Sequence, residues 1–120
     1  MTVNKREIGF SYTVGAARAL DALKAERGAA DLRTLVTGDC KLEGMTDIIL
    51  TLSLWDEKKR AAEEPDYKPK PLTREDVALL PVADLYALFG EAMAAMERDQ
   101  RRSVQAEASE KKSTPDAASF

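Results

Sequence analysis

The feature that most constrains this chain is a change of hydrophobic period near its N-terminus. Ile8, Phe10 and Tyr12 alternate with small residues, and a period of two predicts a short strand with one apolar face. Beyond Thr13 the apolar residues recur at helical spacing, which predicts a helix near residues 14–27. The Thr13 hydroxyl is placed to cap this helix by accepting a free backbone N–H. We therefore expect a strand that runs directly into a capped helix.

Helical spacing recurs along the rest of the chain. The strongest apolar stripe predicts a helix near residues 46–62, capped by Thr46 or Asp47, whose charged last turn runs into water. A strand is the alternative for residues 48–54, but the length of the segment and its charged end favour helix. Further helices are expected near residues 74–80 and 82–102, with a short helix or turn at residues 31–37. The predicted fold is mainly α, a small helical domain with one short N-terminal strand.

Glycine, proline and capping residues predict where the helices begin and end. Gly28 is a C-cap residue for the first helix. Residues 64–71 contain three prolines, which predict an extended linker. Thr73 and Asp76 have the spacing of a capping box, in which each side chain bonds the backbone N–H of the other. Pro81 fits the first turn of the last helix.

The apolar stripes predict one core and the position at which the folded domain ends. The residues expected in this core are Ile48, Leu52, Trp55, Leu85 and Phe89. From Ser103 onward the chain has few large apolar side chains and cannot bury enough surface to become ordered. We therefore predict a helical domain at residues 1–102 and a disordered C-terminal tail at residues 103–120.

The composition argues against several kinds of site. The chain has no histidine, which removes the commonest general base near neutral pH and the commonest metal ligand. Its one cysteine, Cys40, cannot form an internal disulfide or a zinc site of the Cys and His type. No catalytic residue, cofactor or metal site is therefore predicted, although an enzyme that uses carboxylates or lysine is a remote alternative.

The net charge and the hydropathy of the chain limit its possible partners and its cellular compartment. The net charge of −3 argues against a strongly basic nucleic-acid binder. No apolar run reaches the roughly 18 residues that a membrane span needs. The charged N-terminus lacks the apolar core of a signal peptide, so the expected compartment is a reducing cytoplasm.

The end of the last predicted helix carries the candidate partner-binding residues. Met93 and Met96 close its apolar stripe, and flexible thioethers suit adaptable binding surfaces, although core filling is their commoner use. Arg98, Arg101 and Arg102 follow as a basic cluster with acids between them. If both methionines are exposed, these residues form an apolar patch with a basic end that suits a long amphipathic helix.

Three segments in order resemble a known family. They are Phe10–Leu20, Pro71–Asp76 and Asp84–Phe89, and a charged tail follows them. In this order they resemble the tail assembly chaperones of long-tailed bacteriophages and prophages. The resemblance covers about residues 6–102 and lies in element order and loose motifs. Many relatives begin with a longer strand or hairpin than the single strand predicted here.

The resemblance implies a non-catalytic protein of the host cytoplasm. It implies binding to the tape-measure protein, which is kept soluble while the tail tube polymerises around it. The implied partners are the tape-measure and tail-tube proteins, and we expect self-association but no binding to nucleic acid or membrane. The alternative is a small helical regulatory or DNA-associated protein of a mobile element, against which the acidic balance argues.

The resemblance also implies a longer second product made by ribosomal frameshifting. Glu110-Lys111-Lys112 can be encoded by the run of adenines that favours such a shift. The expected longer product matches this chain through Lys112 and then diverges.

Overall fold

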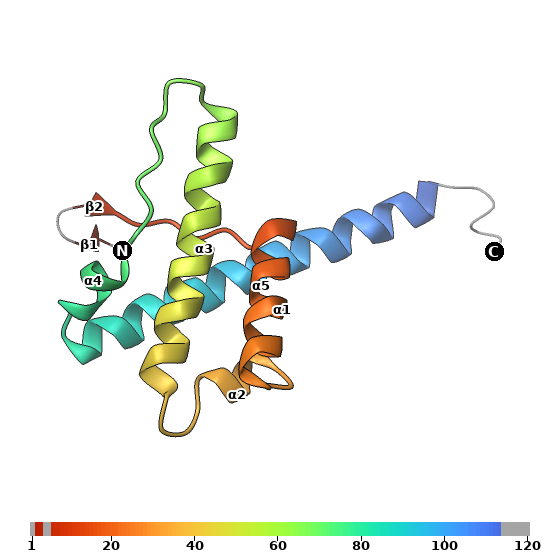
Figure 1. Cartoon of the computed structure of the whole chain (residues 1–120). Coiled ribbons are helices and arrows are strands. Elements are labelled where there is room, and N and C mark those ends of the chain that lie inside the picture. Colours follow the sequence, from red (N-terminus) through yellow and green to blue (C-terminus); the bar gives the residue numbers. More distant parts are fainter. Residues whose placement is uncertain (1, 4–5, 114–120) are drawn as a thin grey trace.

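The computed structural model of this chain describes residues 2–3 and 6–113, and the side chains of residues 7–102 (Figure 1). Helices predominate, so the mainly helical fold predicted from the sequence is confirmed. The described elements are β1 (Thr2–Val3), β2 (Arg6–Glu7), α1 (Val14–Arg27), α2 (Leu32–Leu35), α3 (Lys41–Glu63), α4 (Arg74–Ala78) and α5 (Val82–Ser113). No helix in this part of the chain has the length and apolar character needed to cross a bilayer.

Helix α3 is the centre of the fold. It packs against α1 and crosses α5, while α2 joins α1 to the start of α3 (Figure 1). Residues 64–73 lead from the end of α3 back along it to α4, which packs against α3. The C-terminal part of α5 extends past α1, away from the other helices (Figure 1). The body of the protein therefore has two layers, with α1 and α3 on one side and α5 on the other.

Three helix ends form as their local signals predict. The Thr13 hydroxyl oxygen accepts a hydrogen bond from the Ala16 N–H at 3.1 Å and caps α1. Gly28 ends the same helix in the left-handed conformation, with φ of 65°. Thr73 and Asp76 form the complete capping box of α4. These ends depend on short-range hydrogen bonds, which is why the sequence alone predicts them.

The strand predicted at residues 8–12 is not formed, and that expectation is wrong. The strands of the described residues are β1 and β2, which precede it and pair with each other in antiparallel register. Residues 8–13, here named the strap, have no regular secondary structure. The alternation still has its predicted effect on burial, because Ile8 and Phe10 are only 5% and 6% exposed. The strap crosses the core as an extended segment without a neighbouring strand.

Helix α3 begins at Lys41 rather than near residue 46. Its N-cap is Cys40, which makes no side-chain capping bond. Thr46 and Asp47 lie inside the helix, so the prediction that either caps it is wrong. The sequence prediction missed this first turn because its cap has no polar side-chain signal.

Gly44 explains how α2 and α3 approach each other. A Cβ atom at this position would overlap the backbone carbonyl of Leu35. A glycine inside a helix ordinarily lowers helix stability, but here it allows backbone contact between two elements. This contact fixes the turn between α1 and α3.

Helix α5 continues to Ser113, whereas the predicted helix ended near residue 102. The predicted boundary between a domain at residues 1–102 and a tail at residues 103–120 therefore does not coincide with a helix end. Residues 114–120 lie outside the described residues, so disorder in that part of the tail stays a prediction.

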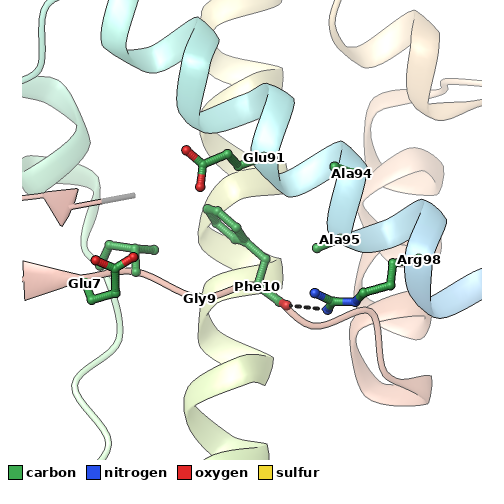
Figure 2. A pocket seen from close by; sticks show the side chains of 8 residues that line it. Glu7, Gly9, Phe10, Glu91, Ala94, Ala95 and Arg98 are labelled. Atoms are coloured by element: carbon green, nitrogen blue, oxygen red, sulfur yellow. Dashed lines mark hydrogen bonds between the residues drawn. The ribbon is translucent and has the colours of Figure 1, made fainter.

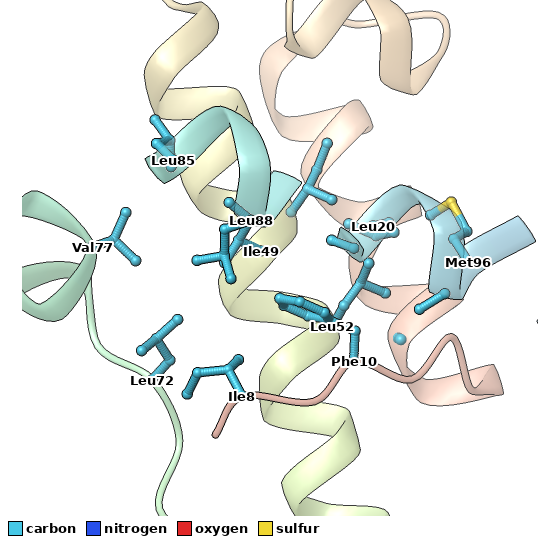
Figure 3. Packing of buried hydrophobic residues seen from close by; sticks show 14 residues of the cluster. Ile8, Phe10, Leu20, Ile49, Leu52, Leu72, Val77, Leu85, Leu88 and Met96 are labelled. Atoms are coloured by element: carbon cyan, nitrogen blue, oxygen red, sulfur yellow. The ribbon is translucent and has the colours of Figure 1, made fainter. Parts of the chain in front are cut away.

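The core lies where α3 crosses α5, with α1 and the strap beside it (Figure 3). The largest fully buried apolar side chains are Leu20, Ile48, Ile49, Leu52 and Leu88. Of the predicted core residues, Ile48, Leu52 and Leu85 are buried, while Trp55 and Phe89 are partly buried and pack against the cluster. The core face of α5 consists of Leu85, Leu88, Ala92, Ala95 and Met96.

Candidate functional site

The two methionines predicted at a partner surface occupy different environments. Met96 is 7% exposed and belongs to the core (Figure 3). Met93 is partly buried and packs against the same cluster. They do not form an exposed methionine patch, because Met96 is buried in the core. The condition for the predicted surface is therefore not met, and the role of these residues in partner binding stays a prediction.

The predicted basic cluster lies beside the strap. Arg98 donates from Nη2 to the Phe10 carbonyl at 3.2 Å and from Nε to Asp99 at 3.0 Å. The hydrogen bond to Asp99 raises the pKa of the Arg98 guanidinium above its ordinary value, although burial opposes the rise. Arg101 forms an ion pair with Glu97 one turn earlier, and Arg102 is exposed. Arg98 and Arg101 are thus bound to neighbouring groups of the same chain.

The strap is fixed to two helices by hydrogen bonds. The Tyr12 backbone N–H donates to the Asp99 carboxylate at 2.8 Å. The Ser11 backbone N–H donates to the Leu52 carbonyl at 3.2 Å, and its hydroxyl donates to Asp56 at 2.6 Å. These bonds satisfy backbone groups that a strand would satisfy by pairing.

Asp99 has an altered pKa because of this arrangement. Burial raises the pKa of its carboxyl, but hydrogen bonds from Arg98 and the Tyr12 N–H outweigh burial, and the net pKa lies below the ordinary value. The carboxylate form is therefore the one that holds the strap.

A groove lies between the strap and α5 (Figure 2). Its volume is about 450 Å³. The residues that line it are Glu7, Ile8, Gly9 and Phe10 from the N-terminal segment and Glu91, Ala94, Ala95 and Arg98 from α5. Figure 2 shows the Phe10 ring and the alanines between the acidic side chains and Arg98. The groove is apolar in the middle and charged at its ends, so it can hold an apolar side chain.

Two buried acids connect elements of the fold: Asp47, which the sequence analysis considered only as a helix cap, and Glu57. The Asp47 side chain is 7% exposed, and its two oxygens bind Arg27 of α1 and Arg74 of α4. Arg74 also donates to Glu43 at 2.8 Å. Arginine can bind two acceptors at once, so this cluster links α1, α3 and α4. The position of Asp47 beside the apolar stripe could have indicated a buried acid. Its partners Arg27 and Arg74 lie far away in the sequence, so the sequence alone does not identify them.

Glu57 connects the linker, residues 64–71, to α3. Its carboxylate accepts the Tyr67 hydroxyl at 2.6 Å and the Lys70 backbone N–H at 2.7 Å. The hydrogen bond to Glu57 raises the pKa of the Tyr67 phenol. The charged residues at the end of α3 are exposed from Lys58 onward, as expected, but Asp56 and Glu57 just before them are covered by the strap and the linker.

The remaining candidate surface is on α5. The largest exposed apolar side chains of this helix are Val82 and Tyr86, which are 50% and 42% exposed. On the same side the helix carries exposed small residues and the partly buried Met93. We define the α5 face as Val82, Ala83, Tyr86, Ala87, Gly90 and Ala94. Its six residues are uncharged in a chain whose composition is 32% charged, and the Lys41 Nζ lies 6.0 Å from the centroid of the Tyr86 ring.

Among the described residues, no group of three or more acidic, Cys or His side chains is arranged to hold a metal ion. Compared with family models, curated proteins and solved structures, the chain matches none.

Proposed function

We propose that this chain is a non-catalytic tail assembly chaperone of a long-tailed phage or prophage. In this role it acts in the host cytoplasm, binds the tape-measure protein and keeps it soluble while tail-tube subunits polymerise. The tail-tube protein is a second partner, and the chaperone also self-associates. The resemblance of residues 6–102 to that family is the source of the proposal.

The observation that best supports binding as the function is the exposed α5 face. Val82 and Tyr86 leave apolar surface in water on a helix whose opposite side is buried against α3. Uncovered apolar surface next to a folded core is typical of sites that bind other proteins.

The buried acids Asp47 and Glu57 and the partly buried Asp99 also agree with a non-catalytic role. Asp47 and Glu57 bind arginines, a tyrosine hydroxyl and a backbone N–H of the same chain. Asp99 binds the strap and Arg98. Each of these acids has a structural task, which accounts for its burial without invoking a reaction.

Co-purification tests this function. The tagged chain is co-expressed with the tape-measure protein of the same phage or prophage, and with an unrelated long helical protein as the control. We expect only the tape-measure protein to be retained with the tagged chain. Retention of neither protein would contradict the proposal. Salt-sensitive binding of the purified chain to duplex DNA would favour the DNA-associated alternative.

A further inference from the structure

We draw no further inference here: the strongest candidate, the groove between the strap and the middle of α5, carries no argument because nothing in the structure shows what covers it.

Discussion

Two glycines in the middle of helices, Gly44 and Gly90, have opposite surroundings. A Cβ at Gly44 would overlap the Leu35 carbonyl, whereas a Cβ at Gly90 meets nothing. We predict that Gly44→Ala lowers the free energy of unfolding by about 1–3 kcal/mol because the backbones must separate. Gly90→Ala should raise it by about 0.5–1 kcal/mol through helix propensity alone. Urea unfolding of both variants measures these effects, and a shift of the same sign in both would contradict the described contacts.

A second residue-scale prediction concerns the acid that links three helices. Asp47→Ala leaves Arg27 and Arg74 without their shared carboxylate. Arg74 has a 54% exposed side chain and can turn into water, so we expect a loss of about 1–3 kcal/mol rather than the larger cost of a fully buried pair. Glu43→Gln is the matched control. Its side chain is 54% exposed, so its ion pair with Arg74 contributes less than about 1 kcal/mol to the free energy of unfolding. Equal unfolding midpoints for the two variants would contradict the linking role of Asp47.

Single residues also mark the limit of prediction from sequence. Thr13 and Gly28 act on neighbours a few positions away, so their roles follow directly from the sequence. Asp47 and Glu57 bind groups from other elements, and no local pattern identifies these partners. The burial of Met96 depends on contacts of the second kind, so the sequence analysis could not predict it, and the role of the predicted residues in partner binding stays a prediction.

The strap shows what periodicity can and cannot predict at the scale of an element. Alternation correctly predicts that Ile8 and Phe10 are buried. It cannot predict whether a neighbouring strand exists, and here helices α3 and α5 supply the hydrogen-bond partners instead. In the same way, Phe89 was predicted in the core and is only partly buried against it, whereas the fully buried Leu88 and Ala92 were not predicted.

The strap should respond to acid. The pKa of Asp99 in the folded chain is lower than its ordinary value of 3.8, so its carboxylate stabilises the folded state above that pH. As the pH falls below 3.8 and through the lowered pKa, the carboxylate is protonated and this stabilisation is lost. Amide exchange at Tyr12, measured by nuclear magnetic resonance, should therefore speed up in this range relative to core amides of α3.

The control for this experiment is Asp99→Asn, which cannot titrate. Its Tyr12 amide should exchange faster than the wild-type amide at neutral pH and lose most of its additional acid dependence. If the wild type and the variant behaved alike across the range, Asp99 would not be the group that holds the strap.

For the whole molecule, the crossing of α3 and α5 is the main source of stability. Leu52 and Leu88 are both fully buried there, and we predict that replacing either by Ala costs about 2–5 kcal/mol. Phe89→Ala should cost less than either, because Phe89 is only partly buried. Chemical unfolding of the three variants tests this order. A larger loss for Phe89→Ala than for Leu88→Ala would mean that α5 is rotated relative to the described core.

We propose that this folded helical body holds another protein in solution. The most direct measurement is the soluble fraction of the tape-measure protein, expressed with and without this chain and assayed by centrifugation and light scattering. We predict that the tape-measure protein aggregates alone and stays soluble with the chain at equal amounts. Aggregation to the same extent in both cases, with the chain folded, would contradict the account.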